Sequence, residues 1–169
     1  MIIWINGAFG SGKSSVATAL HKRIENAYIF DPEETGFYIR ANVPQDIYPG
    51  DFQDIKLWRE INYRMLLHIS RTFKGTIIAP MTITDHAFFN EIVGELRLND
   101  VDIKHFTLLA KEQTLLKRLD SRGDDHNSWA AQQVGRCTTS LGHELFDEHI
   151  DTESIDVEEV ATYIMNKCF

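Results

Sequence analysis

The residues whose types and spacing suggest chemistry most directly lie near the N-terminus. Residues 7–14 read G-A-F-G-S-G-K-S and fit the pattern G-x-x-x-x-G-K-S/T. In this pattern the glycines let backbone N–H groups surround a phosphate, the lysine brings a cation to the β and γ phosphates, and the last hydroxyl is a ligand for Mg²⁺. The pattern predicts a site for ATP and Mg²⁺, with Lys13 as a catalytic cation and Ser14 as the metal ligand. The residues expected to contact the nucleotide here are Gly7, Ala8, Phe9, Gly10, Ser11, Gly12, Lys13, Ser14 and Ser15.

The alternative for this run is a glycine-rich turn with an incidental lysine. The wholly apolar residues 2–5 precede it, and Val16, Leu20 and Ile24 recur every four residues after it. A short buried strand before the glycines and an amphipathic helix after them are the context that the motif requires. The N-terminus of that helix also directs its positive dipole end at a bound anion. This context favours a phosphate-binding loop over an incidental turn.

Arginines in the second half of the chain are spaced to form a lid. Arg118 and Arg122 lie four residues apart on a predicted helix, so they project from one face. A polar run, 123–127, separates them from Arg136 on the next predicted helix. This arrangement resembles the lid of small P-loop kinases, in which arginines contact the adenine and spread charge over the transferring phosphoryl group. The alternative is a solvated helix face. We expect a lid at about 118–136, with all three arginines on the nucleotide and Arg118 and Arg122 catalytic.

The acid that such a site needs has one main candidate. Asp31 ends the predicted strand 27–30, whereas the predicted strand 76–79 is followed by no acid before Asp85. Kinases of the shikimate and gluconate type often place an aspartate at the position of Asp31, where it takes or orients the proton of the acceptor alcohol. The same residue precedes Pro32 and is equally suited to capping a helix. Both roles remain open, and Asp85 is the next candidate.

An acceptor pocket is expected beside this acid. Aromatic and polar residues on the two following predicted helices fall where small kinases bind their acceptor. Aromatic walls with few polar groups suit a nucleoside-like or amphiphilic acceptor better than a bare sugar acid. Arg40 is the member of this set that we expect to bind substrate, together with Asp31. Thr82, after the third predicted strand, is either a further substrate contact near Mg²⁺ or a plain strand-end threonine. The set comprises Phe37, Tyr38, Arg40, Trp58, Arg59 and Asn62.

Strands and helices must alternate to position these residues. Short apolar runs predict strands, and apolar residues at four-residue spacing predict helices between them. Such alternation predicts right-handed crossovers and a parallel sheet with ligands at the carboxyl ends of its strands. We therefore expect one domain over 1–169, of α/β class: a three-layer P-loop NTPase fold, nucleoside- and shikimate-kinase-like, with a parallel five-stranded sheet and a helical lid. The expected strands are 2–5, 27–30, 76–79, 103–109 and 148–151, and the main expected helices are 13–24, 54–73, 86–97, 111–122 and 128–141.

Composition excludes several other classes of protein. The chain has 169 residues and a formal net charge of −8, which disfavours nucleic acid as a partner. Its two cysteines are too few for a disulfide framework, and they form no zinc motif with the histidines. No apolar run approaches the length of a membrane span. We expect a cytoplasmic protein that acts on a small molecule.

Beyond these motifs, the sequence resembles the ATP-binding tunicamycin-resistance proteins of bacilli over nearly its whole length. The resemblance implies a P-loop kinase fold, ATP binding at Gly7 to Ser14 and protection against a nucleoside antibiotic. Family members carry a basic, amphipathic tail beyond the point where this sequence stops, so no firm membrane association is expected. The segments that carry the resemblance are M-I-I-W-I-N-G-A-F-G-S-G-K-S at 1–14, D-P-E-E-T-G-F at 31–37, D-F-Q-D-I-K-L-W-R at 51–59, P-M-T-I at 80–83, H-F-T-L-L-A at 105–110, T-L-L-K-R-L at 114–119 and N-S-W-A-A-Q-Q at 127–133.

Two functions fit these observations. The first is an ATP-dependent phosphotransferase that acts on a small hydroxyl compound, possible acceptors including a nucleoside antibiotic such as tunicamycin. The second is a non-catalytic ATP-binding protein that sequesters a ligand. Arg118, Arg122 and Asp31 favour the enzyme, because a protein that only binds its ligand needs no lid that stabilises a phosphoryl group.

Overall fold

A five-stranded parallel sheet forms the centre of the computed structural model, which describes residues 1–125, 127–146 and 148–169. The strand order is β2-β3-β1-β4-β5, and every neighbouring pair runs parallel. The predicted α/β class and the five-stranded parallel sheet are therefore confirmed. The strands are β1 (Ile2–Gly7), β2 (Ala27–Ile29), β3 (Thr76–Pro80), β4 (Ile103–Leu109) and β5 (His149–Asp151).

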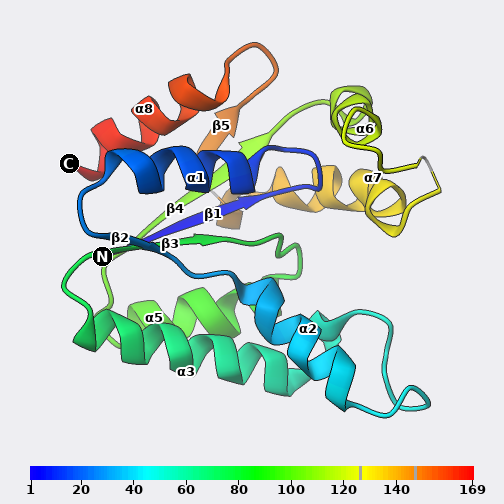
Figure 1. Ribbon diagram of the computed structural model, residues 1–169, viewed down its shortest axis with the longest axis horizontal. Coiled ribbons are helices and arrows are strands. Elements are labelled where there is room, and N and C mark those ends of the chain that lie inside the picture. The colour runs from blue at the N-terminus through cyan, green and yellow to red at the C-terminus, as the bar shows by residue number, and fades with distance from the viewer. Residues whose placement is uncertain (126, 147) are drawn as a thin grey trace.

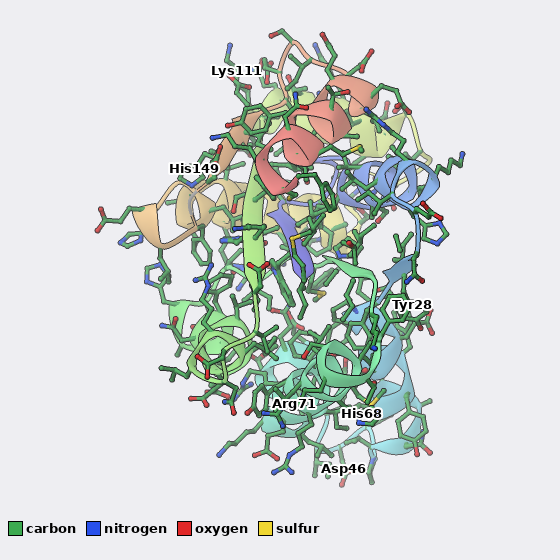
Figure 2. The ribbon with its side chains drawn as sticks, turned by 90° about the vertical axis from the view of Figure 1, so that its left-hand side faces the viewer. Tyr28, Asp46, His68, Arg71, Lys111 and His149 are labelled. Carbon is green, nitrogen blue, oxygen red and sulfur yellow. The ribbon has the colours of Figure 1, made fainter. Side chains whose placement is uncertain are left out.

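Helices cover both faces of the sheet and make three layers (Figure 1). On one face lie α1 (Lys13–Arg23) and α8 (Val157–Cys168), which pack against each other. Figure 2 shows the layers from the side, with Lys111 and His149 in the upper part and with His68 and Arg71 on α3 in the lower part. Side chains of the other helices join the core on the opposite face; these helices are α2 (Pro32–Asn42), α3 (Lys56–Thr72), α4 (His86–Phe89), α5 (Glu95–Leu98), α6 (Glu112–Asp120) and α7 (Trp129–Leu141).

The central strand explains why the sheet is buried on both sides. All six residues of β1 are buried. Successive side chains of a strand point to opposite faces, and here Ile3 and Ile5 join the core under α1 and α8, while Ile2 and Trp4 join the core under α3. A strand with apolar residues at every position therefore requires helices on both faces, as the sequence predicted.

The helix predicted over 86–97 is helical but not uniform. A π-helical segment, η2 (Asn90–Gly94), separates α4 from α5. A π turn accommodates an extra residue within a helix, and here it allows Ile92 and Val93 to enter the core while Glu91 meets Arg59 of α3. Within the described parts of the chain, no helix is long and apolar enough to cross a membrane.

Candidate functional site

The loop between β1 and α1 has a shape that its glycines make possible. Gly10 and Gly12 have φ angles of 81° and 96°, in the left-handed region that favours glycine. A Cβ atom on Gly10 would also lie 2.8 Å from the carbonyl oxygen of Leu115 in α6. The loop therefore lies close against α6, in a conformation that requires glycine at these two positions.

The lysine of this loop is buried and has few partners. Lys13 is 9% exposed, and its Nζ donates a hydrogen bond to the carbonyl oxygen of Ala8 at 3.0 Å. Burial lowers the pKa of this ammonium from 10.5 to about 8, against the opposing effect of Glu33. Nearby, the Oγ of Ser11 is buried and has no hydrogen-bond partner among the described residues. A buried cation with one backbone partner suits a polyphosphate, whose oxygens would neutralise its charge.

Side chains at the ends of β1 and β3 fix the start of the loop. The amide of Asn6 donates to the carbonyl oxygen of Ile83 at 2.8 Å and accepts from the N–H groups of Gly7 and Ile83 at 2.9 and 3.0 Å. Thr82 is 4% exposed, and its hydroxyl donates to the carbonyl oxygen of Gly7 at 2.8 Å. This hydrogen bond fits the strand-end threonine that the sequence also allowed, and the predicted contact of Thr82 with substrate near Mg²⁺ stays a prediction.

Three pockets lie in a row along the carboxyl edge of the sheet. The outer pocket, of about 370 Å³, lies between the phosphate loop, α6 and the segment that leads into α8. The loop pocket, of about 190 Å³, contains Lys13, Ser14 and Asp31. The aromatic pocket, of about 480 Å³, lies between α2, the chain around Phe52 and α7. The outer and loop pockets share Arg122, so they are neighbours.

The predicted lid arginines occupy three different environments. Arg118 lines the outer pocket, and its guanidinium donates to the carbonyl and hydroxyl oxygens of Thr152 at 2.6 and 3.2 Å. Arg122 lines both the outer pocket and the loop pocket and forms an ion pair with Asp124 at 3.0 Å. Arg136 is exposed on α7 and lies outside the lining of all three pockets, as far as the described residues define them. The structure therefore brings two of the three arginines to the loop.

Asp31 caps a helix and also lines the loop pocket. Its carboxylate accepts a hydrogen bond from the N–H of Glu33 at 2.9 Å and so caps α2. The same side chain lines the loop pocket together with Lys13. The alternative acid, Asp85, caps α4 and lines none of the three pockets among the described residues. Asp31 therefore remains available for chemistry while it caps the helix.

Glu33 is the acid that sequence reasoning missed. It lines both the loop pocket and the aromatic pocket, as does Phe9. Burial raises the pKa of the Glu33 carboxyl, the neighbouring Asp31 raises it further, and Lys13 opposes the rise. A carboxylate with a raised pKa is a better proton acceptor at neutral pH. The available signal was its position two residues after Asp31, at the start of a helix that follows a buried strand.

The aromatic pocket is built from distant segments. Phe9 of the phosphate loop meets Trp129 of α7 edge to face, with ring centroids 5.2 Å apart. Phe37 of α2 meets Phe52 of η1 (Phe52–Asp54) at 6.4 Å, and Arg40 lies 5.7 Å from the Phe37 ring. Phe37 and Arg40 thus line a pocket as expected for acceptor residues.

Other expected acceptor residues have structural partners. The indole N–H of Trp58 donates to the carbonyl oxygen of Pro32 at 2.9 Å, and the amide of Asn62 donates to the carbonyl oxygen of Trp58 at 2.9 Å. Arg59 is buried and pairs with Glu91 at 2.7 Å. Trp58 and Arg59 thus join α3 to its neighbours, and Asn62 does so by accepting a hydrogen bond from the hydroxyl of Thr35 in α2 at 3.3 Å. The pocket is instead completed by the chain before α3, which contributes Tyr48, Gly50, Asp51, Phe52 and Gln53.

Comparison with known families identifies the class of this fold. The AAA domain family matches residues 2–141, so the chain belongs to that family. Among solved structures it is similar to a gluconokinase from Sinorhizobium meliloti 1021, at 16% identity and a TM-score of 0.64 over 95% of this chain and 86% of that one. It is also similar to the shikimate kinase from Acinetobacter baumannii, at 15% identity and a TM-score of 0.62 over 99% and 92%. The fold is therefore that of P-loop kinases, as predicted.

A more similar structure narrows the family. The tunicamycin resistance protein of Deinococcus radiodurans is 31% identical, with a TM-score of 0.82 over 99% of this chain and 94% of that one. The chain belongs to the same family as that protein, which confirms the resemblance found in the sequence. A search of curated proteins found no match.

Proposed function

We propose that the protein is an ATP-dependent phosphotransferase that moves the γ-phosphoryl group of ATP to a hydroxyl of a small molecule. The observation that carries the proposal is the row of three pockets and the residues at their junctions. Arg122 lines the first two pockets, and Glu33 lines the second and third. ATP would place its base in the outer pocket and its phosphates in the loop pocket. The acceptor would occupy the aromatic pocket.

The residues of the loop pocket suit both ATP and Mg²⁺. Lys13 is a buried cation with a backbone carbonyl as its partner, and the hydroxyl of Ser14 and the carboxylate of Asp31 line the same pocket. Oxygen ligands of this kind are those that Mg²⁺ prefers. Mg²⁺, when bound, neutralises charge on the phosphates. Ser14 and Asp31 are the residues that would hold it.

The side chains at the junction can complete the transfer. The acceptor oxygen forms a bond to the γ-phosphorus while the bond from that phosphorus to the bridging oxygen breaks, and ADP leaves with the electron pair. Glu33 or Asp31 takes the proton of the acceptor hydroxyl. Arg122 spreads positive charge over the oxygens of the transferring group. Arg118, which Thr152 holds in place, supports the base.

The acceptor follows in part from the family. The D. radiodurans relative is a tunicamycin resistance protein, and an aromatic pocket accepts a nucleoside-like compound. Tunicamycin is therefore among the acceptors that we propose for this chain, and its phosphorylation would confer resistance. Because such a reaction draws on ATP, we propose a cytoplasmic location for the protein.

A screen of ATP consumption tests the proposal. The purified chain is incubated with Mg·ATP and with nucleosides, aminoglycosides, nucleotide sugars or tunicamycin, and ADP release is measured together with the mass of each acceptor. We expect ADP release that depends on one acceptor class, with a phosphorylated product. Tight binding of ATP and of an acceptor without ADP release would favour the non-catalytic, sequestering protein instead.

A further inference from the structure

This inference rests on the proposed function, in which the acceptor binds in the aromatic pocket. The charged residues that line this pocket then restrict the charge that the acceptor can carry. Among the described residues of its lining, Glu33 and Asp51 are acidic and Arg40 is the one cation. The cations of the phosphate loop and lid, Lys13 and Arg122, line the neighbouring loop pocket. In the proposed function they are occupied by the phosphates of ATP.

Asp51 is held with its charge largely uncompensated. Its carboxylate caps η1 by accepting a hydrogen bond from the N–H of Gln53 at 2.9 Å. Burial raises the pKa of this carboxyl and Asp54 adds to the rise, whereas the hydrogen bond from the N–H of Gln53 and the charge of Arg136 lower it. A close ion pair would lower the pKa of a carboxyl instead. Asp51 therefore contributes a negative potential to the pocket.

Arg40 is poorly placed to offset both acids. It is exposed near the C-terminal end of α2, and its guanidinium lies 5.7 Å from the Phe37 ring centroid. Recognition of a carboxylate or phosphate usually employs a guanidinium fork directed at the anion, often with a second donor. One arginine, in a lining that also holds two carboxylates, does not provide such a site.

The walls of the pocket indicate what it does recognise. Phe37 and Phe52 line one part, and Phe9 and Trp129, in edge-to-face contact, line another. Aromatic walls bind planar rings by stacking, and carboxylates beside them accept hydrogen bonds from hydroxyl and amino groups. A volume of about 480 Å³ is within the range of small-molecule sites.

We propose that the acceptor is an uncharged or amine-bearing hydroxyl compound with a planar face, such as a nucleoside, and that compounds bearing a carboxylate or phosphate are rejected. Glu33 and Asp51 reject the anion by like-charge repulsion, and the aromatic walls select the planar ring. This inference names the acceptor class of the proposed phosphotransferase. It separates the protein from any P-loop kinase whose acceptor is a sugar acid or a nucleoside monophosphate.

The test compares ligands that differ in one charged group. The full chain is saturated with Mg²⁺ and a non-hydrolysable ATP analogue, so that added nucleotides cannot enter the ATP site. Binding of uridine and adenosine is measured by calorimetry beside that of their 5′-monophosphates, and shikimate and gluconate serve as non-planar anions. We expect each nucleoside that binds to do so at least about tenfold more tightly than its monophosphate, because the phosphate and the pocket carboxylates repel each other.

A matched pair of variants assigns the rejection to Asp51. Asp51→Asn keeps the helix cap, since asparagine caps as well as aspartate. It should strengthen monophosphate binding several-fold and so narrow the affinity gap between each nucleoside and its monophosphate. Asp54→Asn removes the same charge from an exposed neighbour outside the pocket lining, and it should narrow the gap less. Equal or tighter binding of the monophosphates by the wild type would overturn the inference. So would an unchanged gap in Asp51→Asn, or the failure of every neutral and amine-bearing compound to bind.

The acceptor inference and the proposed function can fail separately. If the wild type phosphorylates shikimate, gluconate or a nucleoside monophosphate, the charge argument is wrong and the phosphotransferase stands. If a nucleoside binds selectively and no compound ever produces ADP, the charge argument stands and the phosphotransferase is wrong.

Discussion

The nucleotide side and the acceptor side of this protein are built in different ways. On the nucleotide side, consecutive residues of the loop after β1 provide backbone groups, one buried lysine and hydroxyls. On the acceptor side, the wall is made of side chains from the phosphate loop, α2, the chain around Phe52 and α7. Backbone N–H groups recognise any phosphate, whereas side chains decide which acceptor fits. Substitutions should therefore have large, general effects on the first side and selective effects on the second.

The largest effect is expected at Lys13. Replacement by alanine removes the one side-chain cation of residues 7–15, so Lys13→Ala should abolish measurable binding of Mg·ATP, as followed by calorimetry. Lys22→Ala, which changes an exposed lysine at the end of the same helix, is the control and should bind normally. Normal ATP affinity in folded Lys13→Ala would show that the phosphates bind elsewhere.

Arg122 comes next, at the junction of the outer and loop pockets. Arg122→Ala should lower kcat by about 10³-fold and change KM for ATP much less, because its charge acts mainly in the transition state. Its exposed ion pair with Asp124 contributes at most about 1 kcal/mol, so the fold should persist. Arg136→Ala on α7 is the matched variant and should have the smaller effect. A change confined to KM would mean that Arg122 only helps to hold ATP.

Glu33 and Asp31 are the two candidates for accepting the proton of the acceptor, and Asp31 is also a candidate ligand for Mg²⁺. If Glu33 takes the proton of the acceptor, Glu33→Gln should reduce single-turnover transfer by about 10²-fold or more. If Asp31 is the base or a metal ligand, Asp31→Asn should show that loss of transfer instead. Its free energy of unfolding, from thermal melts, should stay within about 1 kcal/mol of wild type because asparagine also caps the helix. We expect transfer to fall in both variants and ATP binding to weaken only in Asp31→Asn. Wild-type transfer in either variant would reduce that residue to a structural role.

The smallest effect should appear only on the acceptor side. Gly36 lies in α2, and a Cβ atom there would meet ring carbons of Phe52 at 2.5 Å. Gly36→Ala should displace that ring at an overpacking cost of about 1–3 kcal/mol, partly offset by the better helix propensity of alanine. Acceptor KM should rise several-fold with ATP affinity unchanged. Gly142→Ala, where a Cβ atom would have no neighbour closer than 3.7 Å, is the control. If Gly36→Ala weakened ATP binding as much as acceptor binding, the nucleotide side and the acceptor side would not be independent.

The contrast between the two sides also explains what the sequence could predict. The apolar run in β1, the glycines of the loop after it and the helix cap Asp31 are local patterns, and each is present in the structure. The partner of Thr82, the carbonyl oxygen of Gly7, could not be predicted because it lies on another strand.

The acceptor wall was only partly predicted for the same reason. Phe9 and Trp129 meet through the fold alone, and Asp51 lies in a stretch whose prolines and glycine indicate only a loop. Glu33 became a candidate only because it lines both the loop pocket and the aromatic pocket. No spacing rule along the chain encodes such contacts, because they depend on how separate elements pack.

The burial of Lys13 has a consequence for the heat of nucleotide binding. With a pKa of about 8 in the free protein, about half of the molecules hold a neutral amine at pH 8. Polyphosphate favours the ammonium and raises that pKa, so binding at pH 8 should draw up to about half a proton from the buffer. Apparent binding enthalpies measured in Tris and in phosphate should then differ in proportion to the buffers' ionisation enthalpies. At pH 6, where Lys13 is already charged, this difference should vanish.

The proton on Lys13 favours nucleotide binding but lowers the stability of the nucleotide-free protein. The unfolded chain binds it up to pH 10.5 and the folded chain only up to about 8, so the free energy of unfolding should rise with pH between these values. Nucleotide affinity should fall over that range. Raising the pH from 8 to 10.5 should therefore weaken nucleotide binding and stabilise the nucleotide-free protein against unfolding. Both effects come from the ammonium group of Lys13.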